Sequence, residues 1–415
     1  MNKSDLPSVT LTVVFFALTA VWGGSAKAGS LVAADTAINC FQSSPAVTEK
    51  PLNDLVGSTV QGSINSNTTT GEGAQVAASG AGVWDAACLR QFYQGTPGQW
   101  PKPHIDDGIV WHEMQVVPEP VPPQTPEQQS LIELGSVLFH DKRLSSKGET
   151  ACVSCHSSKH AFSDGRALAV GEDKMMGKRR SQTLYAAPFA SLLFWDGRAS
   201  SLEALIRDPV ENPVEMNHKM EKAAQFVAGD PAYQVLTLAA FNHANITETE
   251  VAEALASFIR TIRPPKTLAD KAFAGDTSQL SDRQLLGLHL FRTKARCMNC
   301  HNGALLTDYQ FHNIGLSFYG RRNQDLGRFE FTRNKEDLGK FRTPSLRNIA
   351  NAGPWMHNGL FPKLDGLIRL YNQGMGNTDR GDPNDEYAPL KSEHIKVLNL
   401  SADEMSALVE WLEVL

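Results

Sequence analysis

Two short motifs carry residue types that bind a metal cofactor covalently. Each has the form Cys-x-x-Cys-His, and together they comprise Cys152, Cys155 and His156 in the first and Cys297, Cys300 and His301 in the second. This spacing is the attachment signature of haem c, in which both thiols form thioethers and the adjacent histidine binds the iron. Structural zinc is the competing interpretation, but no Cys/His pair at zinc-ligand spacing follows either motif. We therefore predict two covalently bound haem c groups, with His156 and His301 as iron ligands.

The chain holds six cysteines in 415 residues, and the two outside these motifs are Cys40 and Cys88. Six is too few for disulfides to be the main source of stability in a chain of this length. In an oxidising compartment, a disulfide between Cys40 and Cys88 is the simplest fate of the remaining pair.

The N-terminus is typical of an exported protein. An apolar run from Val9 to Trp22 follows Lys3 and precedes the small residues Ala26 and Ala28, as in a secretory signal peptide cleaved after Ala28. The run is shorter than the roughly 20 residues that a membrane-spanning helix needs. We expect the mature chain to reside in the periplasm without a spanning segment, and association with the cell surface stays open.

Composition and charge exclude several classes of protein. Of the 415 residues, 41% are hydrophobic and 20% are charged. These values are ordinary for a globular protein and exclude a wholly disordered chain or a coiled coil. The formal net charge is -6. Because nucleic-acid binding needs a basic surface, this charge argues against a nucleic-acid partner.

Helices are predicted where capping residues precede apolar residues at helical spacing. One helix starts at Thr125 and Pro126, a second spans Thr249 to Ile262, a third starts at Ser281 and the last starts at Ser401. No alternating apolar pattern is long enough to build a sheet. The predicted fold class is therefore mainly α.

A weak internal repeat indicates two related modules. Residues 134–139 precede the first Cys-x-x-Cys-His motif, and the similar residues 286–291 precede the second. The proline-rich run 117–123 is predicted to be an extended linker, and the polar run 29–82 to form loops. We expect two cytochrome c-like haem domains with long loops, preceded by a loop-rich N-terminal extension. The predicted boundaries are 1–28 for the signal peptide, 29–124 for the extension and linker, 125–275 for the first haem domain and 276–415 for the second.

Four further stretches occur in an order that is specific to one family. They run from Phe194 to Ala199, from Asn212 to Met216, from Arg342 to Asn348 and from Pro354 to Gly359. Through these stretches, between residues 126 and 415, the chain resembles the bacterial dihaem cytochrome c peroxidase and MauG family. The resemblance implies an oxidoreductase that reacts with hydrogen peroxide at its first haem and uses the second haem for electron transfer.

Two residues in these stretches are implied to be catalytic. The resemblance places Glu215 beside the first haem, where a carboxylate can take a proton from one peroxide oxygen and deliver it to the other. Alone, such a glutamate would be interpreted as a solvated surface residue. Trp195 is implied to lie between the haems and to relay electrons, in addition to packing in the core. Arg198 is expected to pair with a haem propionate or a carboxylate.

The chain departs from the family pattern at three positions. Glu172 stands where peroxidases that need reductive activation carry a histidine that blocks the first haem, so an open first haem is expected. Leu205 replaces a glutamine that many members have near the active site. Arg180 falls at a calcium-binding asparagine, and its guanidinium near the carbonyls of Ala352 and Pro354 would disfavour a dication. Calcium therefore stays uncertain.

The sixth ligand of the second haem is predicted near the end of the chain. Tyr371 falls where typical members have an axial methionine and where MauG has an axial tyrosine, and Met375 is its rival. A thioether raises the reduction potential, whereas a phenolate lowers it. Packing at a helix end is the ordinary alternative for both residues. His357 is expected to be a propionate or structural hydrogen-bond partner, and His218 to be an exposed loop residue.

Taken together, these features predict a periplasmic dihaem peroxidase that shares oxidising equivalents between its haems through Trp195. In the MauG type, a bound protein partner is oxidised. In a conventional cytochrome c peroxidase, a small cytochrome or cupredoxin supplies electrons instead. The missing blocking histidine and Tyr371 favour the MauG type. A dihaem electron carrier without peroxide chemistry is the alternative from another class, and Glu215 argues against it.

Overall fold

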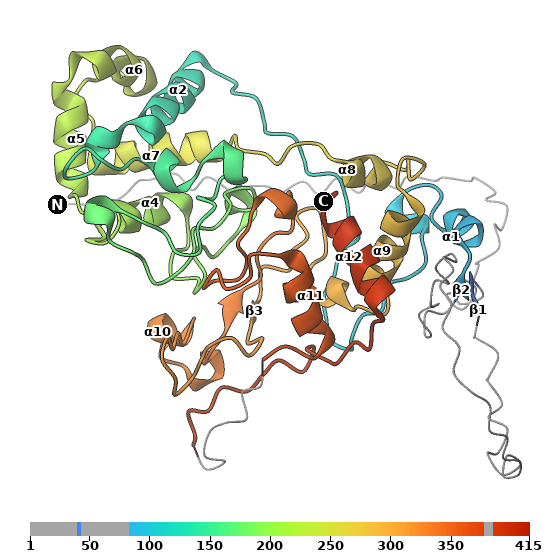
Figure 1. The fold of residues 1–415 in the computed structure, drawn as a ribbon. Helices are drawn as coiled ribbons and strands as arrows, with labels where there is room; N and C mark the ends of the chain where they lie inside the picture. The colour runs from blue at the N-terminus through green and yellow to red at the C-terminus, as the bar shows by residue number, and fades with distance from the viewer. Residues whose placement is uncertain (1–39, 43–82, 377–384) are drawn as a thin grey trace, which may run out of the picture.

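The computed structural model describes residues 40–42, 83–376 and 385–415, which form a mainly helical protein (Figure 1). Its paired strands are short. β1 (Phe41–Gln42) lies antiparallel to β2 (Val83–Trp84), and β3 (Phe311–His312) lies antiparallel to β4 (Phe341–Arg342). The predicted mainly α class is confirmed.

A first hydrophobic core lies among the helices drawn at the upper left of Figure 1. They are α2 (Pro126–His140), α3 (Cys152–Cys155), α4 (Leu202–Glu211), α5 (Met220–Gly229), α6 (Pro231–Phe241) and α7 (Glu248–Ile259). Helix α2 packs against α6 and α7, and its Leu134, Leu138 and Phe139 are buried. This core is the one that carries the first Cys-x-x-Cys-His motif.

A second core lies among helices that are labelled α8, α9, α11 and α12 in Figure 1. They are α8 (Leu268–Phe273), α9 (Asp282–Arg292), α11 (Leu364–Asn372) and α12 (Ala402–Leu412), while α10 (Phe329–Thr332) lies outside this core. Helix α9 packs along α12, where Leu285, Leu288 and Trp411 are fully buried. The second Cys-x-x-Cys-His motif follows α9 directly.

The internal repeat corresponds to one packing feature that both cores share. A Cβ on Gly135 of α2 would collide with the backbone carbonyl of Ala254 in α7. A Cβ on Gly287 of α9 would likewise collide with the carbonyl of Ala407 in α12. Only glycine allows these helix axes to approach so closely, because it has no side chain. The repeated glycine therefore marks the same helix crossing in each module.

The predicted helix starts agree with the structure. Thr125, Ser281 and Ser401 each accept a hydrogen bond from a backbone amide three residues further on, as N-caps do. The helix predicted over Thr249 to Ile262 lies slightly earlier, because Thr247 is its N-cap. Its regular part ends at Ile259, where the chain changes to tighter turns.

The N-terminal extension packs on the second core. The predicted disulfide between Cys40 and Cys88 is present, with Cα atoms 5.6 Å apart. It joins β1 to α1 (Ala86–Phe92), a helix that contacts α9. Buried residues that follow α1, among them Tyr93 and Trp100, belong to the second core. The predicted signal peptide 1–28 and most of the polar run lie outside the described residues.

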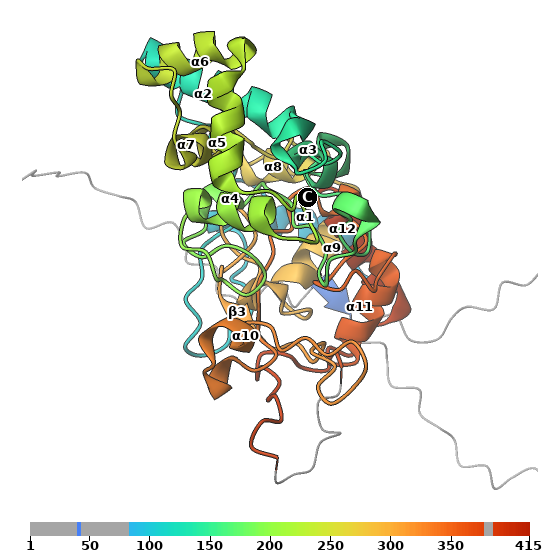
Figure 2. The ribbon, with the colours of Figure 1, turned by 90° about the vertical axis from the view of Figure 1, so that its left-hand side faces the viewer.

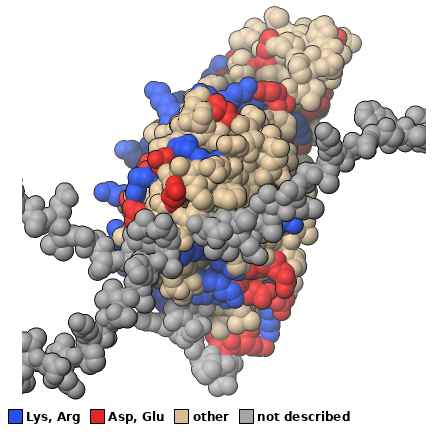
Figure 3. All heavy atoms as spheres, turned by 90° about the vertical axis from the view of Figure 1, so that its right-hand side faces the viewer, with Lys and Arg blue, Asp and Glu red and all other residues tan. Residues whose placement is uncertain are grey.

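Two rotated views show how the helices and charges are distributed. In Figure 2, α2, α5, α6 and α7 stand at the top with α4 below them, and α10 and β3 lie at the bottom. On the face that Figure 3 presents, basic and acidic side chains lie interspersed rather than in one field of a single sign. Within the described part of the chain, no helix combines the length and apolar character required to cross a bilayer.

Candidate active site

The first motif forms a single helical turn, and a backbone carbonyl fixes the orientation of its histidine. Cys152 and Cys155 are the ends of α3, and the backbone amide of His156 donates to the carbonyl of Cys152. The imidazole Nδ1 lies 2.9 Å from the carbonyl oxygen of Phe162. A histidine bonded in this way presents Nε2 to a metal in a fixed orientation. Both thiols are free, and burial raises the pKa of each to about 12.

The second motif repeats this local geometry. The amide of His301 donates to the carbonyl of Cys297, and the imidazole Nδ1 lies 3.1 Å from the carbonyl oxygen of Leu306. Cys297, Cys300 and His301 line one cavity, whose other walls include the apolar side chains Leu364, Leu367, Ile368, Leu408 and Leu412. Two free thiols, one oriented imidazole and apolar walls are the set that haem c requires.

A zinc centre fits these motifs less well. Among the described residues, one group of three side chains gathers at metal-binding distance, and it consists of Cys300, Asp308 and His312. It includes neither Cys297 nor His301. His312 Nε2 also lies 2.7 Å from the Asp308 carboxylate, so the two side chains already satisfy one another. The donor sets therefore favour haem over structural zinc.

Glu215 is held at the first module by contacts to its backbone and side chain. Its carbonyl accepts a hydrogen bond from the amide of Glu172, and one carboxylate oxygen accepts a hydrogen bond of 2.7 Å from the Asn212 side chain. Gly171 approaches so closely that any side chain there would collide with the backbone of Glu215. Burial raises the pKa of the Glu215 carboxyl, and the charge on that carboxylate also raises the pKa of the Cys155 thiol. A carboxyl with a raised pKa thus lies near the first attachment motif.

Glu172, for which the resemblance implies the position of a blocking histidine, has its side chain hydrogen-bonded to a neighbouring turn. Its carboxylate accepts hydrogen bonds from the Ser146 hydroxyl at 2.5 Å and from the backbone amide of Lys147 at 2.9 Å. Although burial opposes ionisation, these hydrogen bonds together with the Ser145 hydroxyl hold the pKa of Glu172 below its usual value. The residue is 1% exposed. Its carboxylate is therefore hydrogen-bonded to the turn formed by residues 145–147.

Trp195 lies where the two modules meet. Its indole nitrogen donates to the carbonyl of Arg180 at 2.9 Å, and its own carbonyl accepts a 2.8 Å hydrogen bond from the amide of Arg342 in β4. The ring is 6% exposed and lines the same cavity as His301. It also meets His357 edge-on, with ring centroids 6.3 Å apart. The tryptophan is thus fixed against both modules.

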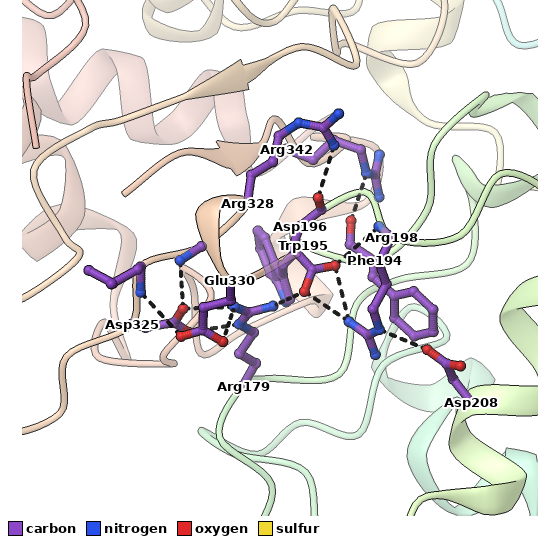
Figure 4. A network of polar contacts seen from close by, with 12 residues as sticks. Arg179, Phe194, Trp195, Asp196, Arg198, Asp208, Asp325, Arg328, Glu330 and Arg342 are labelled. Carbon is purple, nitrogen blue, oxygen red and sulfur yellow. Dashed lines mark hydrogen bonds and ion pairs between the residues drawn. The ribbon is translucent and has the colours of Figure 1, made fainter. Parts of the chain in front are cut away.

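A network of ion pairs, buried in its centre, surrounds the Trp195 loop (Figure 4). Arg179 lies 2.6 Å from the carboxylate of Asp196 and 2.7 Å from that of Asp325, so it joins the two modules. Arg198 pairs with Asp208 at 2.7 Å and with Asp196 at 3.1 Å. The expectation that Arg198 binds a carboxylate is confirmed. Sequence reasoning missed Arg179 and Asp325, because ion pairs between residues so distant leave no local pattern.

Arg180 also crosses between the modules. Its guanidinium donates to the carbonyl of Ala352 and, at 3.0 Å, to the Ser163 hydroxyl. Burial lowers the pKa of Arg180 to about 10, so the side chain remains a cation at neutral pH. The predicted proximity of this arginine to Ala352 is confirmed, and a positive charge occupies the neighbourhood of that carbonyl.

The two candidate ligands of the second site differ in position. Tyr371 of α11 lines the cavity that holds Cys297, Cys300 and His301. Met375 is buried beyond the helix end and does not belong to the cavity wall. Burial, reinforced by the two nearby thiols, raises the pKa of the Tyr371 phenol.

Three further residues were singled out in the sequence, and of these His357 lines the same cavity as His301. His357 is 3% exposed and stacks on Phe341 with centroids 3.7 Å apart, and burial lowers its pKa to about 4. His218 is half-buried rather than exposed, so that prediction is corrected: its amide bonds to the carbonyl of Val210 and draws it against the module. Leu205 packs against the first core.

Comparisons with known proteins agree with this geometry. A family model described as di-haem cytochrome c peroxidase matches residues 129–278. Cytochrome-c peroxidase IdrP1 of Denitromonas iodatirespirans is 33% identical over 330 residues, which cover 72% of this chain and 84% of that protein. The methylamine utilization protein MauG of Methylorubrum extorquens is 33% identical over 350 residues, which cover 84% of this chain and 90% of that protein.

A solved structure supports the same assignment. The crystal structure of a MauG-like protein associated with microbial copper homeostasis superimposes with a TM-score of 0.63 and 29% sequence identity, covering 74% of this chain and 95% of that one. Two haem c groups are therefore implied by the family and match the two attachment motifs. The chain belongs to the bacterial dihaem cytochrome c peroxidase and MauG family, whose members are oxidoreductases that act on peroxide.

Proposed function

We propose that this protein is a MauG-type enzyme that reacts with hydrogen peroxide at the site of His156 and oxidises a protein partner. One observation carries the proposal. The carboxylate of Glu172 is committed to Ser146 and Lys147, so the position of the blocking histidine offers no iron ligand. The first site would then be ready for peroxide without prior reduction.

Glu215 is the proposed acid/base catalyst at this site. A bound haem would supply the iron that polarises peroxide, with Cys152 and Cys155 as its attachments and His156 as its ligand. Because burial raises the Glu215 pKa, its carboxylate is a stronger base than an exposed glutamate and returns the proton as a stronger acid than water would. The Asn212 hydrogen bond fixes one carboxylate oxygen, which leaves the other to exchange the proton.

Trp195 is the proposed electron relay between the two sites. Its indole lines the second cavity, and its neighbours Arg179 and Arg342 hold the loop in place from both modules. The indole N–H donates to the carbonyl oxygen of Arg180. The negative partial charge on this oxygen stabilises an oxidised indole and so favours loss of an electron from the ring. The second haem would be attached by Cys297 and Cys300.

Two ligands, His301 and Tyr371, are proposed for the second iron. Tyr371 is preferred to Met375 because it lines the cavity and Met375 does not. An anionic oxygen ligand lowers a reduction potential and so stabilises the oxidised state. This choice favours the MauG-type reaction over the conventional peroxidase, in which a small cytochrome or cupredoxin would be the electron donor. Calcium is not part of the proposal, since Arg180 already supplies a cation beside Ala352.

The proposed location is the periplasm. The disulfide between Cys40 and Cys88 needs an oxidising compartment, as the signal-like N-terminus also suggests. We propose haem domains at 125–275 and 276–415, and residues 83–124 add their buried side chains to the second one.

A direct experiment can decide whether the enzyme oxidises a partner protein or takes electrons from a small cytochrome or cupredoxin. Purified protein would be treated with peroxide in the presence of periplasmic proteins from its own source, with and without a reduced small cytochrome or cupredoxin. The MauG type is supported if mass spectrometry finds oxidised tryptophan or tyrosine in a partner protein and the added donor is not consumed. Rapid donor oxidation without partner modification would support the conventional peroxidase.

A further inference from the structure

A buried tyrosine and a buried histidine share a hydrogen bond behind the second attachment motif. Tyr93 follows α1 and His289 lies in α9, and the phenolic oxygen is 2.9 Å from the imidazole Nδ1. Tyr93 is 0% exposed and His289 is 8% exposed. Among the described residues, the phenol has no other acceptor within hydrogen-bonding distance. Tyr93 therefore donates its hydrogen to Nδ1 of His289.

Both partners of this hydrogen bond are uncharged at neutral pH. Burial, aided by the positive charge of Arg292, lowers the pKa of His289 to about 4. Burial raises the pKa of the Tyr93 phenol. The charged groups beside the pair are Arg292 and Glu113, which form an ion pair with each other. A neutral phenol thus faces a neutral base inside an apolar core.

Aromatic and cationic side chains connect this pair to the second site. The Tyr93 ring lies 5.3 Å from that of Trp100, and the Arg292 guanidinium lies 5.4 Å above the Trp100 ring. Arg292 also lies 3.6 Å from the sulfur of Met298, which stands between the two cysteines of the motif. Contacts through Trp100, Arg292 and Met298 therefore link Tyr93 to the second attachment motif.

The N-terminal extension covers the pair on its other side. Phe41 stacks on the His289 imidazole with ring centroids 5.1 Å apart, and it pairs with Trp84 across β1 and β2. The disulfide fixes Cys40, the neighbour of Phe41, to α1. A buried tyrosine can be purely structural, but the extension also supplies Trp100 and Trp84. The extension thus places an oxidisable residue, Trp100, directly beside Tyr93, while Phe41 lies against His289 and pairs with the partly exposed Trp84.

We propose that Tyr93 is a redox-active tyrosine of this enzyme, with His289 as its proton acceptor. The proposal rests on the reaction with peroxide, which supplies two oxidising equivalents. Tyr93 gives one electron to the peroxide-oxidised enzyme, and its phenolic proton moves to Nδ1 of His289. The products are a neutral tyrosyl radical and an imidazolium, so charge and atoms balance. An external electron donor later reduces the radical, and the proton returns to the phenolate oxygen.

This step gives the enzyme a second place for an oxidising equivalent. When no partner protein is bound, an equivalent held at Tyr93 is kept away from Glu215 and Trp195. The hydrogen bond to His289 makes the transfer possible, because an oxidised phenol is a strong acid and must release its proton locally. The buried position protects the radical from solvent until a donor arrives.

The test uses the haem-loaded full-length protein, treated with peroxide without a donor and frozen at short times for EPR spectroscopy. Wild-type protein should show a tyrosyl signal that narrows when the protein contains ring-deuterated tyrosine. Tyr93→Phe should lose this signal, whereas Tyr233→Phe should keep it. Tyr233 is a matched control because its buried ring donates to a carboxylate, Asp141, in the first module. His289→Gln should lose most of the signal while Tyr93 remains in place.

Optical spectra of the same samples separate the possible failures. Haem content and the optical response to peroxide should be unchanged in Tyr93→Phe, which shows that the variant folds. A tyrosyl signal that persists in Tyr93→Phe overturns the inference, as does a wild-type protein that responds optically to peroxide but forms no tyrosyl radical. A wild-type protein without any optical response contradicts the proposed function and, with it, this inference.

Discussion

At the scale of single residues, the proposed chemistry depends on how tightly Glu215 is positioned. Its carbonyl accepts a hydrogen bond from the Glu172 amide, its carboxylate accepts one from Asn212, and Gly171 packs closely against its backbone. Burial raises its pKa, so its carboxylate is a stronger base than that of an exposed glutamate. These contacts are the physical basis for assigning proton transfer to this residue.

Glu215→Gln should slow the reaction with peroxide by about 10²–10⁴-fold, the usual contribution of a positioned acid/base group. The amide cannot take up the peroxide proton, although it has nearly the same shape. Stopped-flow absorbance would measure the rate, and the haem content of the variant provides the control. An unchanged rate removes Glu215 from the mechanism.

The pH dependence of the same rate tests the electrostatics of the site. The base must be ionised, so the rate falls as the pH drops through the Glu215 pKa. Because burial raises that pKa, the acidic limb should lie above the usual range of a glutamate. Asn212→Ala removes a hydrogen bond that favours the carboxylate, so it should move the limb to still higher pH. A limb that does not move with Asn212→Ala would assign it to another group.

At the scale of helices, each module depends on one close crossing. Gly135 allows α2 to approach α7, and Gly287 allows α9 to approach α12. Each glycine lies in the helix that precedes an attachment motif, so the crossing fixes where the motif begins. The internal repeat in the sequence thus reflects a shared requirement for placing the cysteines.

Gly287→Ala should lower the free energy of unfolding by roughly 1–3 kcal/mol, because the added methyl group collides with a backbone carbonyl. The matched control is Gly366→Ala in α11, where a Cβ has open space. That change should instead stabilise the protein by about 0.5–1 kcal/mol. Denaturant titration of both variants would check the difference in sign.

The sequence predicts some elements well and others poorly, for physical reasons. Helices with a Ser or Thr cap, such as those after Thr125 and Ser401, were predictable because the cap and the apolar spacing are local signals. Helix α11, which carries Tyr371, has no side-chain cap and was not predicted. Helix α1 was missed as well, although Asp85 caps it, because its seven residues are too few to show a helical repeat of apolar side chains.

The candidate site likewise has features that the sequence predicts and features that it does not. The attachment motifs and the Cys40–Cys88 disulfide follow from cysteine spacing and compartment alone. The bonds of Glu172 to the 145–147 turn and the Arg179 network join distant segments, so they could be known only from the folded chain.

At the scale of the whole molecule, the two modules are joined by ion pairs between side chains that are largely buried from solvent. The side chains of Arg179, Asp196 and Asp325 are 15%, 7% and 12% exposed. In such surroundings an ion pair adds little net stability, but losing one partner is costly, because it leaves an uncompensated charge. The network therefore fixes the Trp195 loop to the second module more than it strengthens the fold.

Arg179→Leu should destabilise the protein by about 3–5 kcal/mol, because two buried carboxylates lose their common partner. It should also alter the reduction potentials of the haems, since the Trp195 loop is no longer fixed. A spectroelectrochemical titration and thermal unfolding would measure both effects. Lys266→Ala, which breaks an exposed pair with Glu119, should change neither. If Arg179→Leu changed the stability and the reduction potentials no more than Lys266→Ala does, the network would not fix the Trp195 loop to the second module.

EPR of the oxidised protein before and after peroxide tests the central claim, an open first site, most directly. The account predicts a high-spin signal from the His156 site in the resting oxidised protein, because Glu172 cannot serve as a sixth ligand, and its loss when peroxide is added. A resting spectrum with only low-spin signals, unchanged by peroxide, would contradict the account and would instead fit a dihaem electron carrier.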